Sequence, residues 1–329
     1  MSPPKRHHFV PQSYLARFGL DDQVRVRRRG SADPYTTNVI NVAVRGGFYT
    51  TVSSDGTTST SVEEKLSHLD DAGVQVMREI DRTGRLPTPG SDDREVLCLY
   101  LAVQMNRTPE KRTVVLFPEA VKAYAGDRPL DRTLVAEYLE RDHLGFAPQP
   151  TEVEGALSWL QGVSAYGVPS QNDAISATLG TVAELVPHFR GRHWQLEISH
   201  NADFLTSDSP LVLWKPNSKE DAYKGFGLMD AHQIRFPLDP RKQLVLTRGT
   251  GTSVADVSPR RVERCNADLA DTCEQVIVGH PHRPIWQDKV DLRERGPRLR
   301  FNQAPGFQVG PNGRREPMGD IIHHWTSRR

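Results

Sequence analysis

Two adjacent histidines, His7 and His8, lie near the N-terminus and are followed by Phe-Val-Pro at positions 9–11. A neutral imidazole can bind a metal ion or accept a proton near neutral pH, and the proline restricts the backbone directly after the pair. Apolar residues at helical spacing over 14–18, ended by Gly19, predict a short amphipathic turn. The pattern indicates either a histidine site held by a fixed segment or a solvated terminal pair.

Two carboxylates accompany the first long helix that the sequence predicts, over residues 61–80. Apolar residues form one stripe along this helix. At about 100° per residue, Glu63 and Asp70 fall together on the shoulder of the stripe, two turns apart. Glu63 is therefore a candidate metal ligand at the edge of a packed face. The alternative is that both carboxylates form a solvated flank.

Gln104 and Arg107 lie at the end of a second predicted helix, which is apolar almost all round over residues 96–105. Gln104 falls on a buried face, and Arg107 follows less than one turn later, before Thr108-Pro109 ends the helix. A buried guanidinium requires an acidic partner or a ligand. Arg107 therefore either binds an anionic, phosphate-bearing substrate or pairs with Glu63 or Asp70 at the helix end.

Asp208 stands in a Ser-Asp-Ser-Pro kink between two predicted strand pieces, in a region where the hydrophobic period changes from helical to alternating. A hairpin across Asp239-Pro240, a helix over 262–272 and a short strand over 275–279 are expected to follow. We predict an α+β fold: an N-terminal strand-and-turn segment, a helical middle, and a C-terminal antiparallel sheet packed on the helices.

We expect residues 1–329 to form a single large domain, since the chain is long enough for a sizeable core. Within it we expect a mainly helical part with N-terminal strands over 1–190, a mainly β part over 191–290 and an irregular tail over 291–329. In that tail, residues 320–325 predict a terminal turn.

The overall charge excludes a strong field that would attract nucleic acid, because 42 Lys and Arg balance 41 Asp and Glu. Nucleic-acid binding would need a local patch. The densest basic run lies on a predicted strand over 24–29, and it consists of Arg25, Arg27, Arg28 and Arg29. The same run is equally consistent with an edge strand protected by charge.

Cysteine usage and hydropathy indicate the compartment. The three cysteines form no Cys-x-x-Cys pair, and no apolar run approaches the roughly eighteen residues that a membrane span needs. No apolar stretch typical of a signal peptide follows the basic N-terminus. We therefore expect a cytoplasmic protein that does not cross a membrane.

Several of these pieces occur together, in one order along the chain, in a known family. They are residues 7–15 with Phe18, Val62-Glu63 with Leu66, residues 104–109, residues 206–210, residues 236–240 and the helix around Asn266. In this combination the chain resembles the bacterial family named domain of unknown function 4238. The resemblance implies an intracellular bacterial protein without an established activity. It also marks the recurring positions His7, His8, Glu63, Gln104, Arg107 and Asp208.

A second resemblance covers only residues 7–11, which are similar to the opening of His-Asn-His nucleases. It would make His7 a metal ligand and His8 the base that activates water against a phosphodiester. The chain departs from that pattern further on. The expected asparagine does not follow closely, and the helix that should carry the last histidine presents Glu63.

The leading hypothesis is a metal-dependent hydrolase of the phosphodiesterase or nuclease type. His7, Glu63 and Asp208 would hold a divalent metal ion, His8 and Gln104 would act in catalysis, and Arg107 would bind the anionic substrate. The rival is a non-catalytic interaction or defence-associated module, in which the same residues form a buried polar network. An enzyme should present unpaired ligands, whereas a module should satisfy each of these groups internally.

Overall fold

The computed structural model describes the chain except for residues 1–5, 32, 165–169, 217–224, 310–313 and 328–329. The chain divides into two compact units. The first comprises Met1–Arg112, Ile175–Lys215 and Leu228–Gly296, and the second comprises Thr113–Ala174, Pro216–Gly227 and Pro297–Arg329. Both units draw on residues from before and after position 190, at which the sequence predicted a subdivision.

A five-stranded sheet forms the centre of the first unit. In spatial order its strands are β12 (Thr252–Asp256), β7 (His193–Ile198), β11 (Lys242–Thr247), β10 (Gln233–Asp239) and β9 (Val212–Trp214). Neighbouring strands are antiparallel except for β12 and β7, which are parallel. Trp194 and Leu196 alternate with less buried neighbours along β7, as the sequence predicts for a strand.

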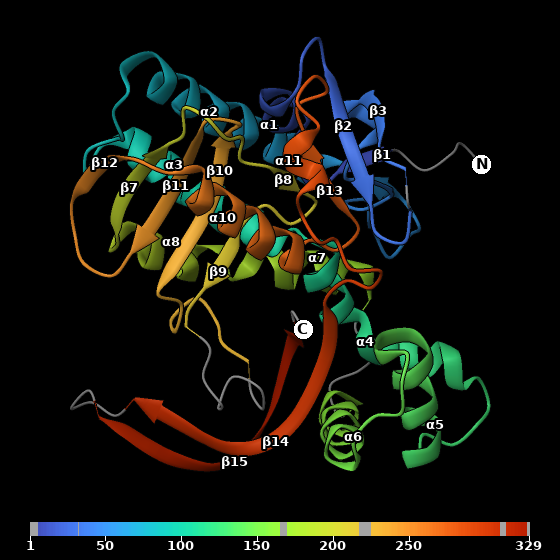
Figure 1. Cartoon of the computed structure of the whole chain (residues 1–329). Coiled ribbons are helices and arrows are strands. Elements are labelled where there is room, and N and C mark those ends of the chain that lie inside the picture. Colours follow the sequence, from blue (N-terminus) through green and yellow to red (C-terminus); the bar gives the residue numbers. More distant parts are fainter. Residues whose placement is uncertain (1–5, 32, 165–169, 217–224, 310–313, 328–329) are drawn as a thin grey trace. The chain divides into compact units, whose positions relative to one another are not determined.

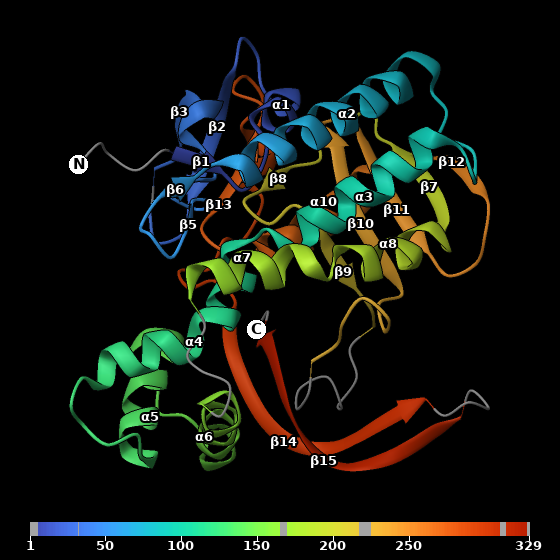
Figure 2. The same ribbon diagram turned by 180° about the vertical axis from the view of Figure 1, so that it is seen from behind.

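Helices cover both faces of this sheet. Helix α10 (Pro259–Thr272) crosses the face that Figure 1 presents. On the opposite face, seen in Figure 2, lie α2 (Ser61–Thr83), α3 (Asp92–Asn106) and α8 (Val182–Arg190). Helix α2 packs closely on α3, because Gly73 leaves room for a ring: a Cβ at position 73 would lie 2.4 Å from Cδ2 of Tyr100.

The first unit contains a second sheet of four strands. The N-terminal segment (residues 6–46) contributes two of these strands. The order of the sheet is β3 (Tyr35–Asn38), β2 (Gln23–Arg28), β13 (Val276–Gly279) and β8 (Thr206–Ser207). Strands β1 (Arg6–His8) and β4 (Val44–Gly46) form a separate antiparallel pair. Between β1 and β2, α1 (Gln12–Leu15) and a 3-10 turn (Ala16–Phe18) bury Tyr14, Leu15 and Phe18.

The second unit contains α5 (Arg132–Tyr138), a π-helical turn (Leu139–Leu144), α6 (Pro150–Ser164) and most of α4 (Pro109–Ala125). Its core gathers around Phe117 and Phe301, whose ring centroids are 4.7 Å apart. Phe301 belongs to a long two-stranded ribbon of β14 (Arg298–Val309) and β15 (Arg315–Ser327). Helix α7 (Gln171–Gly180) begins in this unit and ends in the first.

The predicted α+β class is confirmed, but two local expectations are wrong. The tail over 291–329 is not irregular, because β14 and β15 pair along nearly their whole length and β15 includes the predicted turn over 320–325. A bulge between Gly306 and Phe307 interrupts the alternation that would have revealed the strands. The sequence over 39–44 also predicts a strand that ends at Gly46-Gly47, but the structure has a 3-10 turn there (Val39–Asn41), followed by the start of β4.

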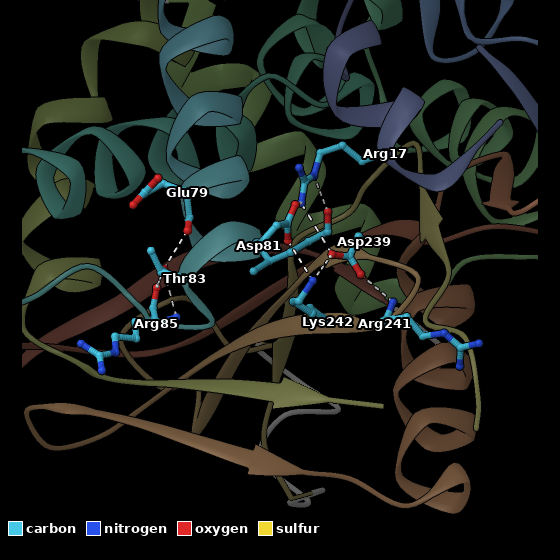
Figure 3. Close-up of polar contacts among 9 residues, drawn as sticks. Arg17, Glu79, Asp81, Thr83, Arg85, Asp239, Arg241 and Lys242 are labelled. Atoms are coloured by element: carbon cyan, nitrogen blue, oxygen red, sulfur yellow. Dashed lines mark hydrogen bonds and ion pairs between the residues drawn. The ribbon is translucent and has the colours of Figure 1, made fainter. Parts of the chain in front are cut away.

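Four charged residues fasten the N-terminal segment to α2 and to the turn between β10 and β11 (Figure 3). Arg17 Nη2 lies 2.9 Å from Asp81 Oδ2 and 3.7 Å from Asp239 Oδ2. Lys242 Nζ lies 2.9 Å from Asp81 Oδ1 and 3.1 Å from Asp239 Oδ2. Arg17 Nε also donates to the carbonyl of Leu238 at 2.7 Å. The two cations and two anions form a neutral cluster that bridges three segments.

We expect Asp239→Asn to lower the free energy of unfolding by roughly 1–3 kcal/mol, because it leaves two cations with one carboxylate in a largely buried place. Urea denaturation measures the change. Glu79→Gln is the matched control, since Glu79 pairs with Arg82 at the surface and should leave the midpoint unchanged. Equal urea midpoints for the wild type, Asp239→Asn and Glu79→Gln would contradict a stabilising role for the cluster.

Candidate functional site: a buried polar cluster at the N-terminal segment

His7 has both ring nitrogens occupied. Its side chain is 0% exposed, and Nδ1 accepts a hydrogen bond from the backbone N–H of Tyr49 at 2.7 Å. The neutral ring therefore carries its proton on Nε2, which lies 3.0 Å from Oε2 of Glu63. The Tyr49 ring stacks on the imidazole at 5.9 Å between centroids and 12° between planes. His7 thus has no nitrogen lone pair free to bind a metal ion or accept a proton.

His8 points to the other side of β1, as successive residues of a strand do. Its Nε2 lies 3.1 Å from the carbonyl oxygen of Ile40, to which only a protonated nitrogen can donate. Its Nδ1 then accepts from the side-chain amide of Gln12 at 3.2 Å. Burial lowers the pKa of His8. His8 is accordingly a neutral, hydrogen-bonded side chain outside the surroundings of His7.

Arg107 forms a buried ion pair with Asp70. Its Nη1 and Nη2 lie 3.0 Å and 2.7 Å from the two carboxylate oxygens, and its guanidinium is 0% exposed. Gln104 completes the arrangement, because its Oε1 accepts from Nε and Nη2 of Arg107 at 3.0 Å and 2.8 Å. Burial raises the pKa of Asp70, and the charge of Arg107 opposes that shift. The pair has no net charge with which to attract an anionic substrate.

Gln104 joins this pair to the N-terminal segment, because its Nε2 donates to the carbonyl of Phe9 at 3.3 Å. Tyr49 lies next to both halves of the arrangement: it stacks on His7 and interacts electrostatically with Arg107, Asp70 and Glu63. We call this set the polar cluster, and it consists of His7, Tyr49, Glu63, Asp70, Gln104 and Arg107. It brings together four of the six residues that the sequence singled out and leaves out His8 and Asp208.

Asp208 fastens two strands of the four-stranded sheet. Its Oδ1 accepts from the backbone N–H of Glu274 at 2.8 Å, and its Oδ2 accepts from those of Gln275 and Val276 at 2.6 Å and 3.1 Å. Burial raises its pKa to about 6. Of the predicted ligands, His7 and Glu63 are in contact, and Asp208 lies outside their cluster. Within the described part of the chain, no three or more His, Cys, Asp or Glu side chains are grouped to hold a metal ion.

The basic run on β2 is directed mainly inward. Arg27 Nη1 donates to the carbonyls of Gln287 and Val290, each at 2.8 Å. Arg29 is buried and donates to carbonyls that include that of Cys273 at 2.9 Å. Arg25 is half-buried, and only Arg28 is exposed. The surface of this strand therefore presents far less positive charge than its sequence suggests.

Comparison with protein families identifies the chain's relatives. A family model described as "Protein of unknown function (DUF4238)" matches residues 6–283. The chain belongs to this family. The matched DUF4238 region contains every residue of the polar cluster and also His8 and Asp208. No curated protein and no solved structure matches the chain. None of the helices that the structure describes is long and apolar enough to cross a lipid bilayer.

Two further residues of the DUF4238 region join segments that are distant in sequence. The Tyr14 hydroxyl donates to the carbonyl of Pro237 at 2.7 Å and lies 2.8 Å from Oγ1 of Thr206. Asn266 accepts from the N–H of Leu205 and donates to the carbonyl of Asp203, both at 2.9 Å. Tyr14 and Asn266 both lie in the sequence pieces that resemble the family, so the resemblance could have indicated them as important. Tyr49 lies in none of those pieces.

The Arg107–Asp70 pair predicts a large effect of a small change. Asp70→Asn should lower the free energy of unfolding by about 3–5 kcal/mol, because it leaves a buried guanidinium without a counter-charge. Urea denaturation measures the loss. Asp71→Asn, one residue further on the exposed side of α2, is the matched control and should change little. Similar losses in both variants would mean that the pair is not what stabilises this region.

Glu274 predicts a pH dependence of stability. One of its carboxyl oxygens, Oε2, is buried and has no hydrogen-bond partner in the described contacts. Burial, together with the nearby charge of Asp208, raises its pKa from 4.5 to about 7. The folded state therefore binds this proton more tightly than the unfolded state does. The contribution of Glu274 to the free energy of unfolding therefore falls as the pH rises from about 4.5 to about 7.

Glu274→Gln removes that loss, since an amide carries no charge at any of these pH values. The variant should be more stable than the wild type at pH 8 by on the order of 1–3 kcal/mol, and nearly equal to it at pH 5. Denaturation at the two pH values measures the difference. A variant that is less stable than the wild type at pH 8 would show that Glu274 is ionised without penalty.

Proposed function

We propose that this DUF4238 chain is a non-catalytic interaction module whose polar cluster fastens the N-terminal segment to α2 and α3. The observation that carries the proposal is the occupancy of the histidine nitrogens. Both nitrogens of His7 and both nitrogens of His8 contact groups of the protein itself. A general base needs a free lone pair that faces its substrate, and a metal ligand needs one that faces the ion.

The remaining candidate residues support the same proposal. The side chain of Gln104 uses its oxygen and its nitrogen, and the carboxylate of Asp208 accepts three backbone N–H groups. Hydrogen-bonded buried polar networks stabilise one arrangement of a core over its alternatives. The Tyr49 hydroxyl is the exception in the polar cluster, because it is buried and has no hydrogen-bond partner among the described residues. In this proposal the role of these residues is to hold a particular surface in shape.

A metal-dependent hydrolase of the phosphodiesterase or nuclease type is the second candidate. One observation favours it: the side chain of Glu63 is 33% exposed, so a divalent metal ion could reach its carboxylate beside His7. The hydrogen bond from Tyr49 weighs against it. A metal ion on Nε2 would have to replace a proton while Nδ1 keeps its acceptor role, which would require an imidazolate. Nucleic-acid binding through Arg25 and Arg28 belongs to this candidate and stays a prediction.

We infer a cytoplasmic location from the cysteines. Cys98, Cys265 and Cys273 are all buried and unpaired. Free thiols in this number fit a reducing compartment, where disulfides seldom form.

The two candidates differ in what the histidines do. If the proposed module is correct, His7→Asn should lower the free energy of unfolding by roughly 1–3 kcal/mol, because buried partners lose their hydrogen bonds. His200→Asn, which changes a surface histidine, is the control and should leave stability unchanged. Urea denaturation gives both values, and elemental analysis of the purified proteins gives their content of zinc, manganese and magnesium.

One metal ion per chain in the wild type, lost from a His7→Asn protein that remains as stable as the wild type, would overturn the module and favour the hydrolase. Equal metal content in both proteins, with a loss of stability in the variant, is the result that the module predicts.

A further inference from the structure

Strand β12 forms an open edge of the five-stranded sheet in the first unit. It pairs with β7 on one side, and no strand of the described part of the chain pairs with its other side. Figures 1 and 2 both show β12 at the end of the sheet. Along Thr252–Asp256 exposed residues alternate with half-buried ones, and Val254 at the centre is 52% exposed. The first unit therefore leaves this edge accessible.

Two hydrogen bonds fix which residues of β12 face β7. The N–H of Trp194 donates to the carbonyl of Gly251 at 3.0 Å. The N–H of Val257 donates to the carbonyl of Ile198 at 2.8 Å. Because alternate residues of a strand direct their N–H and C=O groups to the same side, every second residue between Gly251 and Val257 also faces β7. The residues whose N–H and C=O groups point outward are Thr252, Val254 and Asp256.

The other edges of the two larger sheets in this unit are covered or short. At the opposite end of the five-stranded sheet, Val212 and Leu213 of β9 are 2% and 8% exposed. In the four-stranded sheet, β8 is buried, and β3 is four residues long and directly follows Pro34. Short strands and prolines protect sheet edges from pairing with another chain. Strand β12 contains no proline and no lysine, so its edge lacks this protection.

The sequence of β12 is compatible with pairing to itself. In an antiparallel pair centred on Val254, this residue lies opposite Val254 of a second copy, and Thr252 lies opposite Asp256. Each opposed pair exchanges two hydrogen bonds, so this register uses all the outward N–H and C=O groups of both strands. Opposed side chains share a face, which brings a threonine hydroxyl next to each carboxylate and opposes no two like charges.

Val254 adds an apolar contact at the centre of such a pair. It lies beside Leu196 in the register of β12 with β7, on the same face as Trp194. Trp194 donates from Nε1 to the carbonyl of Phe189 in α8 at 3.1 Å, so this is the face that α8 covers. Trp194 and Leu196 are buried there, whereas Val254 is exposed. A second copy would place its own Val254 next to this one and continue the apolar face across the junction.

We propose that β12 is the interface of a symmetric dimer, in which the five-stranded sheets of two copies join into one. Because β9 covers the opposite edge with buried residues, each sheet can add only one copy, and the assembly closes about a two-fold axis. No residue of the polar cluster lies in β12 or β7, so this interface stands apart from the function proposed above.

Sedimentation velocity of the full chain tests the dimer. The wild type should sediment as a dimer at about 10 μM, and Val254→Pro should raise the dissociation constant at least about tenfold. Proline at position 254 removes an outward N–H and leaves the hydrogen bonds to β7 in place. Its far-ultraviolet circular dichroism should therefore match that of the wild type. Val254→Thr keeps the outward N–H and a β-branched side chain, so it is the matched control and should remain a dimer.

Disulfide cross-linking tests the register, and it does not depend on how the proline variant folds. In the pair centred on Val254, the two Cα atoms of this residue lie about 5.5 Å apart, a separation that a disulfide can bridge. Val254→Cys should therefore give a covalent dimer on a non-reducing gel after mild oxidation. The natural cysteines are buried. Met229→Cys places a thiol at another exposed position; it is the control and should stay monomeric on that gel.

The proposal is overturned if the wild type is still monomeric at about 100 μM. In that case the occupant of the edge would be a strand of a different protein. It is also overturned if Val254→Pro folds and dimerises as well as Val254→Thr, or if Met229→Cys cross-links as readily as Val254→Cys.

Discussion

The buried ion pair between Arg107 and Asp70 is the interaction on which the N-terminal half of the first unit depends. A guanidinium that is fully buried needs a carboxylate in contact, so α3 and α2 are held at one relative position. Gln104 lies one turn before Arg107 and extends this constraint to the carbonyl of Phe9. The N-terminal segment is thereby tied to both helices through one polar network, and the contact of His7 with Glu63 adds a second attachment to α2.

The same principle operates between the other pieces that resemble the DUF4238 pattern. Tyr14 connects the N-terminal segment to Thr206 and Pro237, and Asp208 connects the kink after β8 to the start of β13. Each piece contributes a polar side chain whose partner is a backbone group or side chain of a distant piece. A set of contacts of this kind restricts substitution at both ends of each contact.

The sequence predicted the parts of this arrangement that depend on the type of side chain and on the spacing of apolar residues. The apolar stripes of α2 and α3 are visible in it, and the need of a buried guanidinium for an acid indicated Asp70 as one partner of Arg107. It could not predict that Tyr49 and Ile40 occupy the nitrogens of the two histidines, because the backbone N–H and C=O groups involved are present in every residue. The inward direction of Arg27 was hidden for the same reason, since its partners are carbonyls contributed by residues about 260 positions away.

Arginines that bind carbonyl groups are not electrostatically equivalent, and their position relative to helix ends decides the difference. Arg29 donates to the carbonyls of Ala270 and Cys273 at the C-terminal end of α10, where the partial negative charge of the helix favours a cation. It also interacts with the carboxylate of Asp208. Arg94 lies at the opposite kind of helix end, in a first turn that also contains Asp92, Asp93 and Glu95. The charge of Arg29 thus faces carbonyl groups at a helix C-terminus, whereas that of Arg94 faces two carbonyl groups and the ring of Trp194 at a helix N-terminus with acidic residues in its first turn.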